Sequence, residues 1–588
     1  CVAYTTDLSD SIALIDRGGC AFTTKVLNAQ AAGADFVVVA NNVAGDGAFT
    51  MGGTPESEVT INSVMISFED GNTLKSAIAE NTATYAFSSE LFVKAGAIAT
   101  FTSRGPSVDG LLKPEITAPG TAIDTALVGT GDGTSPISGT SFSSPITAGA
   151  LSLLAEAFPR RNAFELKATL MNNANLDVTL EPRSLNPDAE LAPISYIGAG
   201  LVDVEKASQS TTAAWDSATK QAALVFGLLG LSEEASVTKT VTVKNFSSEP
   251  KTYSLSDQAR FENDAATEAL TMDYPASVTV PAGQTVTFDV TATIDPAKLP
   301  EWTLTSDVAA TPAGSVELTK VEFDGALMLT DQNDVSMHLV YHVLPKAYGS
   351  ATIASELTED GVIRTVTNTG VTDFSTTMVP IMVDSGVDAE KQFDIVNTSL
   401  EYIQVPSSTC PAEALVLTNI TMRDPVASLH QAGWFMDVDV DGDGQFDFTA
   451  QTLNDSAFGR DNADVVTFTR PFGALSGSLF GTIHEPGSNV LSMVSCIDGL
   501  GLTIADLGAA NATVAFRVEN SPFDFFPSVA YDEDLVVQNY SFPLLATPTV
   551  TDDSGEAVAS LAPGEVGFLN GVGDGGFSGF AVPQIIKL

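Results

Sequence analysis

The chain has 588 residues, and a typical domain of roughly 150 residues makes about four domains the first expectation. Its 26 Lys and Arg residues face 73 Asp and Glu residues, and the formal net charge of −47 argues against nucleic acid and anionic membrane surfaces as partners. Because 44% of the residues are hydrophobic and 17% charged, there is ample apolar surface to bury, which excludes a disordered chain. We therefore expect folded domains with an acidic surface, as suits an extracellular protein.

The four cysteines form two separated pairs, Cys1 with Cys20 and Cys410 with Cys496. Neither pair has the C-x2-C spacing of a metal site, so the pattern favours two local disulfides made in an oxidising compartment, with four unrelated buried thiols as the alternative. The sequence has no run of about 18 apolar residues, so it predicts no membrane-spanning helix. Because the sequence opens in mid-domain, with neither an initiator Met nor a signal peptide, we expect more protein upstream.

Residues 1–90 predict an α/β unit, with apolar strands at 11–15 and 36–40 and a helix at 23–32. A pattern written R-G-x-C-x-F, then K, A and A-G-A, occupies Arg17, Gly18, Cys20, Phe22, Lys25, Ala29, Ala32, Gly33 and Ala34. It resembles the protease-associated domain, a small module often inserted into subtilisin-like proteases. The resemblance implies that this unit steers substrates or partners and does no chemistry. Arg17 and Lys25 are then expected to be exposed charges.

Residues 91–208 predict strands, loops and two helices. The first helix follows Ser141 and ends before Pro159, and its apolar residues recur at i, i+3, i+4 and i+7, which is typical of a core helix. The second starts at Asn162, whose side chain can cap the helix while Glu165 three residues on completes a capping box.

The candidate chemistry lies where the first helix begins, at Gly139, Thr140 and Ser141. A nucleophilic serine needs a tight glycine turn that exposes its hydroxyl, and a helix N-terminus whose free N–H groups favour developing negative charge. A serine that merely caps a helix is the alternative for such a tripeptide alone. The flanking stretches "FTSRGPSVDGLLKPEITAPGTAI", "ATLMNNAN" and "GAGLVDVEKA" resemble, in order and spacing, the last part of a subtilisin-like (subtilase) catalytic domain.

The resemblance implies that Ser141 is the catalytic nucleophile of a serine endopeptidase. Gly139, Thr140, Pro145, Ala148 and Gly149 match the family pattern, whereas Phe142, Ser143, Ile146 and Thr147 depart from it. A serine needs a base and a third group that orients the base. The histidines are His338, His342, His430 and His484, all far downstream, and we expect structural roles for them. In this family the Asp, His and oxyanion-hole Asn precede the Ser, so we expect a missing N-terminal segment to supply them.

Residues 209–346 alternate Val and Thr with polar residues between Gly, Pro and Asn turns, which predicts an antiparallel β-sandwich. This stretch resembles the fibronectin type III-like domain that follows the catalytic domain in large secreted subtilases. Residues 347–588 continue the β pattern as one large or two smaller modules. The predicted fold is therefore multidomain: the α/β module at 1–90, the catalytic-domain part at 91–208, the sandwich at 209–346 and the β-rich region at 347–588.

The stretch "DVDVDGDGQFDF" predicts a calcium site. Its carboxylates follow D-x-D-x-D-G-x-x-D spacing, and the expected ligands are Asp439, Asp441, Asp443, the carbonyl of Gln445, and Asp447. It is not an EF-hand, because Ala450 occupies the twelfth position. The ion would be structural, because clustered carboxylates repel one another until a cation neutralises them. An acidic turn between strands is the alternative.

Three functions fit these observations. The first is a secreted or cell-surface bacterial serine endopeptidase, incomplete in this chain, that acts on protein or peptide substrates. The second is an inactive subtilase-derived scaffold that binds proteins outside the cell. The third, a serine hydrolase with a Lys base, is weakest because Lys113 is not in an S-x-x-K arrangement.

Overall fold

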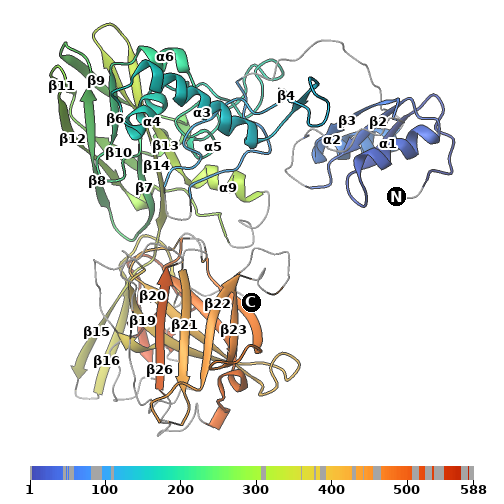
Figure 1. The fold of residues 1–588 in the computed structure, drawn as a ribbon. Helices are drawn as coiled ribbons and strands as arrows, with labels where there is room; N and C mark the ends of the chain where they lie inside the picture. The colour runs from blue at the N-terminus through green and yellow to red at the C-terminus, as the bar shows by residue number, and fades with distance from the viewer. Residues whose placement is uncertain are drawn as a thin grey trace.

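A computed structural model describes the chain outside residues 1–2, 44–47, 49–50, 52–58, 81, 83–95, 108–110, 306–312, 359–360, 376–378, 385–392, 427–428, 430–431, 442, 455–457, 459–464, 486, 506–514, 523–532, 535–548, 571–579 and 582–588. The fold is mixed α/β in its N-terminal part and largely antiparallel β-sheet after residue 211 (Figure 1).

The N-terminal unit is a three-stranded parallel sheet with two helices. Its elements are β1 Ile12–Asp16, α1 Phe22–Ala31, β2 Phe36–Ala40, β3 Asn62–Ile66 and α2 Phe68–Ala79, with strand order β1-β2-β3. The apolar residues of the first two strands and of α1 form their own small core, with Val26, Ala29, Val37 and Val39 buried. The expectation that Lys25 is exposed is wrong: it is 8% exposed and, like Val26 and Ala29, is one of the buried residues of α1, as the long apolar stem of a lysine allows.

The segment that contains Ser141 is built from a hairpin and four helices: β4 Ile123–Ala126, β5 Thr134–Ile137, α3 Thr140–Ala157, α4 Ala163–Asn172, α5 Ile194–Ile197 and α6 Val204–Gln209. The capping box on α4 is confirmed: Glu165 N–H donates to Asn162 Oδ1 at 3.0 Å, and Asn162 N–H donates to Glu165 Oε2 at 2.9 Å. The capping box fixes the residue at which α4 begins, and Leu166 and Leu170 of this helix are buried.

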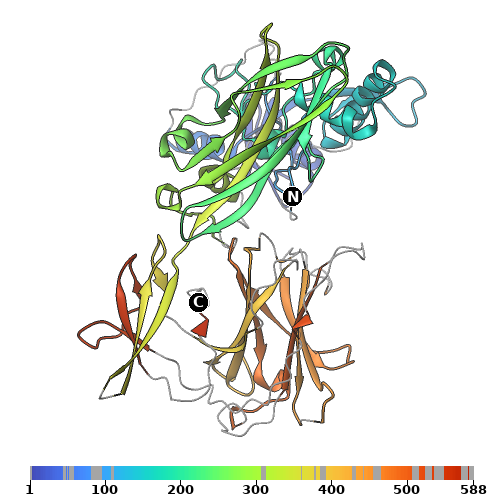
Figure 2. The same cartoon turned by 90° about the vertical axis from the view of Figure 1, so that its left-hand side faces the viewer.

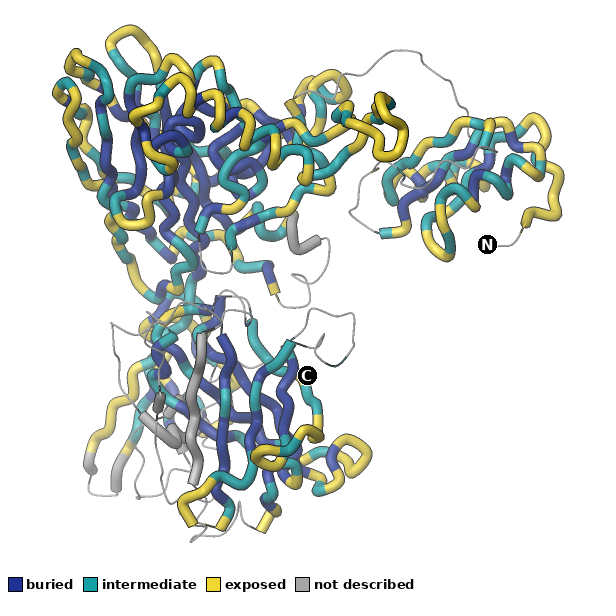
Figure 3. Tube along the Cα trace, in the orientation of Figure 1, coloured by how far each residue is buried: buried dark blue, intermediate teal, exposed yellow. Residues whose placement is uncertain are grey.

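Helix α3 is only partly a core helix. Ala150 and Leu154 are buried, but Leu153, which the periodicity places on the same face, is 58% exposed. Most of this helix is exposed or of intermediate burial (Figure 3). Within the part of the chain that the structure describes, α3 packs on α4 and α6, and these two helices cover one side of it. The pattern predicted the helix correctly and overestimated how much of its apolar face is covered.

The following β-sandwich has two sheets of order β10-β12-β8-β6 and β11-β9-β13-β14-β7. Its elements are β6 Thr212–Asp216, β7 Ala223–Leu231, β8 Ala235–Asn245, β9 Lys251–Ala259, α7 Glu262–Thr267, β10 Leu270–Asp273, β11 Ser277–Val280, β12 Thr285–Ile294, a 3-10 turn Pro296–Lys298, α9 Ala313–Val321, β13 Phe323–Asp331 and β14 Ser336–Ala347. The pairing is antiparallel as expected except between β14 and β7, which run parallel. That geometry needs a long crossover, which residues 232–335 provide.

The sandwich and the Ser141 segment share one hydrophobic core. A single cluster of buried side chains contains Leu112, Met171, Ile194 and Ile197 from the segment and Trp215, Leu224, Leu339 and Tyr341 from the sandwich. Helices α4 and α5 lie against β14, and α4 also contacts β6 (Figure 1). The predicted boundary at residue 208 therefore crosses a continuous core, and the division of the chain into domains stays a prediction.

The C-terminal region holds a small four-stranded sheet and an eleven-stranded sheet (Figure 2). Its strands are β15 Ala351–Thr358, β16 Gly361–Asn368, β17 Phe374–Ser375, β18 Val379–Asp384, β19 Ile395–Gln404, β20 Ala414–Met422, β21 Ala432–Asp439, β22 Phe448–Asn454, β23 Val465–Pro471, β24 Ser478–Ile483, β25 Val490–Cys496, β26 Ala515–Pro522, β27 Glu533–Asp534, β28 Thr549–Thr551, β29 Ser560–Leu561, β30 Val566–Asn570 and β31 Phe580–Ala581, with a 3-10 turn at Ile497–Leu500. Trp434, Met436 and Leu491 are fully buried in the core of the larger sheet.

The predicted disulfide between Cys410 and Cys496 is confirmed, with their Cα atoms 5.7 Å apart. It ties the end of β25 to the chain entering β20, its neighbour in the sheet. Cys20 is also disulfide-bonded, and Cys1, its expected partner, lies outside the described residues.

Replacing both Cys410 and Cys496 by Ser should destabilise the C-terminal region by about 2–5 kcal/mol, because the bond closes a long loop, 86 residues apart in sequence. Urea unfolding followed by the fluorescence of the buried Trp434 measures the change. In the double variant, added reductant should not lower the urea midpoint of this region any further. Equal urea midpoints for the oxidised wild type and the variant would contradict a stabilising role.

Candidate active site around Ser141

Ser141 lies in the first turn of α3 and is exposed. Gly139 precedes the helix, and no side chain of the described residues caps this helix start, so its first backbone N–H groups have no side-chain acceptor there. The aligned peptide dipoles of this 18-residue helix favour negative charge at that end. An exposed hydroxyl beside unpaired N–H donors is what attack on a carbonyl and stabilisation of the resulting oxyanion require.

The loop that positions this helix comes from residues 114–120. Gly120 O accepts a hydrogen bond from Gly139 N–H at 2.8 Å, and a Cβ on Gly120 would lie 2.4 Å from Ser143 Oγ. Residues 114–120 are in turn held by residues 198–202: Ala199 N–H donates to Glu115 O at 3.0 Å, and Val202 N–H donates to Thr117 O at 2.7 Å. The position of the serine thus depends on two segments that are joined by backbone hydrogen bonds.

A cavity of about 700 Å³ opens beside the start of α3. Its lining includes Thr140, Ser143, Ser144 and Thr147 of α3 and Pro119 and Gly120 of the preceding loop. Ser141 is not among the lining residues, so the cavity borders the helix start and does not enclose the hydroxyl.

No histidine of the described residues is placed to take the proton of Ser141. His338 and His342 are buried on β14, where His338 Nε2 lies 2.9 Å from Ala199 O and His342 Nε2 lies 3.0 Å from Glu322 Oε2. His484 Nε2 lies 3.3 Å from Ser488 O. Burial lowers the pKa of His338 and of His484 to about 4, so both are neutral near pH 7. His430 lies outside the described residues.

The predicted calcium ligands gather at the turn after β21. Ligand atoms of Asp439, Asp441 and Asp443 lie within 4.8 Å of one another, and Asp439 is buried while the other two are exposed. Asp447 is not one of these three; its Oδ2 accepts from Val440 N–H at 2.9 Å. Gln445 N–H donates to Asp443 Oδ1 at 2.8 Å. The structure therefore shows an acidic cluster of three carboxylates.

The structure thus places a serine at a helix start in an α/β segment that follows a small α/β unit and precedes β-sheets, which is the arrangement expected from the sequence. Residues 1–74 match the PA domain family. The chain is 33% identical over 258 residues to the minor extracellular protease Vpr of Bacillus subtilis, and 30% identical over 249 residues to the C5a peptidase of Streptococcus pyogenes. The PII-type proteinase of Lactococcus lactis is 30% identical over 274 residues.

Over part of its length the chain is similar to subtilase-family proteases, and its N-terminal residues match the PA domain. The three matches cover 42%, 42% and 43% of this chain, and the chain spans 30%, 20% and 13% of those proteins. Tripeptidyl peptidase 2 aligns with 80% of this chain at 12% identity, but its TM-score of 0.24 is too low to support an argument about the fold. Within the described residues, no helix has the length and apolar character to cross a membrane.

Substitution of Gly198 by Ala should destabilise the Ser141 segment by at least about 2 kcal/mol. Gly198 has φ +60°, and a Cβ there would lie 2.4 Å from the backbone of Glu115 and Pro114, which cannot yield without moving residues 114–120. Thermal unfolding measures the loss. Gly149→Ala on α3 is the control: its Cβ meets nothing within 4 Å, and the change should stabilise the helix by about 0.5–1 kcal/mol. Equal melting of Gly198→Ala and wild type would contradict this packing.

Proposed function

We propose that this chain provides the nucleophile of a subtilisin-like serine endopeptidase that hydrolyses peptide bonds of protein substrates. The observation that supports the proposal is the exposed Ser141 hydroxyl in the first turn of α3, within a chain that is 30–33% identical to proteases. A secreted enzyme would suit the acidic composition, the disulfide, and the relative named as an extracellular protease.

The reaction would proceed through an acyl-enzyme. A base removes the proton of Ser141 as Oγ attacks the peptide carbonyl carbon, and the N–H groups at the start of α3 stabilise the oxyanion. Collapse of this intermediate breaks the C–N bond, and the amine leaves with the proton held by the base. Water then gives one proton to the base as its oxygen attacks the ester carbon, and the base passes that proton to Ser141 Oγ as the C–O bond breaks and the acid leaves.

The base, the carboxylate that orients it and a second oxyanion donor must come from outside the described Ser141 segment. His338 cannot serve, because it is buried and bonded to Ala199 O in the core shared with the sandwich. We propose that an upstream segment of the same protein supplies Asp, His and Asn. In this arrangement the PA domain steers substrates and the sandwich supports the catalytic segment.

A fluorophosphonate probe should label Ser141 in protein that includes the upstream segment, and Ser141→Ala should abolish both labelling and proteolysis. An unassisted serine hydroxyl attacks amides poorly near neutral pH, so the 588-residue chain alone should show neither. Ser152→Ala is the matched control, because Ser152 is an exposed serine on the same helix whose Oγ bonds to Ala148 O. It should keep full labelling.

Two results would overturn this assignment in different ways. Peptide hydrolysis by the 588-residue chain alone would show that it contains a base of its own. Absence of labelling in the longer protein, with folding intact, would favour the inactive scaffold that binds other proteins.

We further propose that the acidic turn after β21 holds a structural calcium ion. Asp439, Asp441 and Asp443 offer hard carboxylate oxygens, the ligand type that Ca²⁺ prefers, on a turn made possible by Gly444 at φ +85°. Asp447 and the carbonyl of Gln445 would complete the ligand set. The ion would neutralise three carboxylates that otherwise repel one another.

Calcium should raise the melting temperature of the C-terminal region, with a stabilisation of about 2.7 kcal/mol at a free concentration about 100 times Kd. Scanning calorimetry with calcium and with chelator measures it. Asp441→Asn should shrink the difference, and Asp553→Asn, which removes an exposed carboxylate in the turn after β28, should leave it unchanged. Equal melting in calcium and chelator, with no heat of binding in titration calorimetry, would refute the site.

A further inference from the structure

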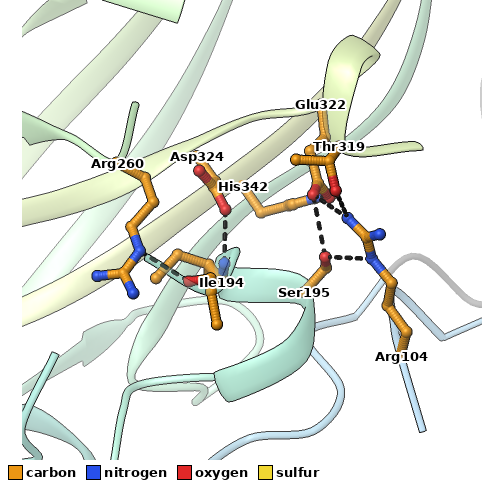
Figure 4. A network of polar contacts seen from close by, with 9 residues as sticks. Arg104, Ile194, Ser195, Arg260, Thr319, Glu322, Asp324 and His342 are labelled. Atoms are coloured by element: carbon orange, nitrogen blue, oxygen red, sulfur yellow. Dashed lines mark hydrogen bonds and ion pairs between the residues drawn. The ribbon is translucent and has the colours of Figure 1, made fainter. Parts of the chain in front are cut away.

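A buried cluster of charged side chains joins the Ser141 segment to the sandwich (Figure 4). Glu322, just before β13, is fully buried and forms an ion pair with Arg104 of the segment. Ser195 Oγ donates to Glu322 at 3.1 Å and accepts from Arg104 Nε at 2.9 Å. His342 Nε2 lies 3.0 Å from the other carboxylate oxygen of Glu322. Both oxygens of Glu322 are therefore satisfied.

Asp324, two residues on, holds the adjacent turn of the segment. Its Oδ2 accepts a hydrogen bond from Ile194 N–H at 2.5 Å, at the start of α5. The charge of Arg260 acts on Asp324, but the Arg260 guanidinium donates its hydrogen bonds to carbonyls of the segment: Ala192 O at 2.8 Å, Leu176 O at 2.8 Å and Val178 O at 3.0 Å. Asp324 thus contacts the segment through one oxygen only.

Two buried carboxyl oxygens in this cluster have no hydrogen-bond partner: Asp324 Oδ1 and Asp264 Oδ2. Asp324 is 1% exposed and Asp264, on α7, is 7% exposed. An ionised carboxylate pays a large desolvation cost at such an oxygen, and for Asp324 the hydrogen bond from Ile194 N–H to the other oxygen offsets only part of it. Protonation removes that charge.

The remaining charged and titratable groups around these two carboxyls include three more carboxyl groups and two arginines. They are Asp257 and Arg260 at the end of β9, Tyr341 and His342 on β14, and Glu322, Arg104 and Asp177. Burial and the charge of Glu322 raise the pKa of Asp264 to about 7, and the same two causes raise the pKa of Asp324 well above 3.8. The two arginines are already used by Glu322 and by backbone carbonyls.

We propose that Asp264 and Asp324 form a proton-dependent latch that holds the Ile194–Ser195 turn of the catalytic segment on the sandwich when protonated and loosens it when ionised. The loosening follows from charge, because two new anions would face Glu322 and each other inside the core. The latch does not depend on the chemistry assigned to Ser141.

The direction of the pH dependence follows from linkage. A carboxyl whose pKa is higher in the folded protein than in the unfolded chain stabilises the fold fully below about pH 4 and loses that contribution as pH rises to about 7. Glu322 acts in the opposite direction. Burial alone would raise the pKa of Glu322, but the hydrogen bond from His342 and the charge of Arg104 outweigh burial and leave that pKa below its usual value. Glu322 therefore stays ionised through this range. The latch is thus closed in mild acid and weakened near neutral pH.

Hydrogen exchange of the Ile194 amide in the 588-residue chain reports the latch directly, since that N–H donates to Asp324. Between about pH 5 and about pH 7, its protection, corrected for intrinsic exchange, should fall by up to about tenfold per pH unit for each carboxyl that ionises. Asp264→Asn should flatten this dependence. Asp273→Asn, an exposed carboxylate on β10 of the same sandwich, should retain it.

A second measurement guards against a variant that fails to fold. Infrared spectra at about pH 6 should show a protonated carboxyl band in wild type and in Asp273→Asn that is reduced in Asp264→Asn. Protection of Ile194 that is independent of pH in wild type, or equally dependent on pH in Asp264→Asn, would overturn the proposal. So would the absence of any protonated carboxyl band.

Discussion

The hydrophobic core shared by the Ser141 segment and the sandwich is the constraint on which the candidate site depends. Met171 and Ile197 pack in the same cluster as Leu339 of the sandwich. Fully buried Asn172 crosses the boundary, because its Nδ2 donates to His338 O at 2.8 Å and its Oδ1 accepts from Ala214 N–H at 2.8 Å. Removing either side would expose apolar surface and leave buried polar groups unpaired. The sandwich is therefore a structural part of the segment that presents Ser141.

Features set by a few neighbouring residues could be predicted from the sequence. The capping box of Asn162 and Glu165 and the helix start at Ser141 depend on local backbone geometry, which the order of residue types reports. The acidic turn from Asp439 to Asp443 is of the same kind. The Cys410–Cys496 disulfide could be predicted on other grounds, because the number of cysteines is even and these two lie in the same region of the sequence.

Features made by distant residues could not be predicted. Arg104 and Glu322 are 218 positions apart, and neither has a local pattern that marks it as buried. Helix α3 shows a related difficulty. Periodicity tells which residues share a face of the helix, but whether a residue such as Leu153 is buried depends on which other elements pack against that face. Strand β14 is buried on both faces, between the sandwich and helices α4 and α5, so its polar residues His338 and His342 lie inside the protein and are hydrogen-bonded there.

The parallel pairing of β14 with β7 has a consequence for the order of folding. Val340 pairs with Ala223 across more than a hundred intervening residues, and β14 is also the strand on which α4 and α5 pack. During synthesis the helix that begins at Ser141 leaves the ribosome long before β14, so its core stays unfinished until residue 347 has been made. Contacts of such long range form slowly. The nascent serine-bearing segment would therefore need protection from aggregation and from proteases while it waits for this strand.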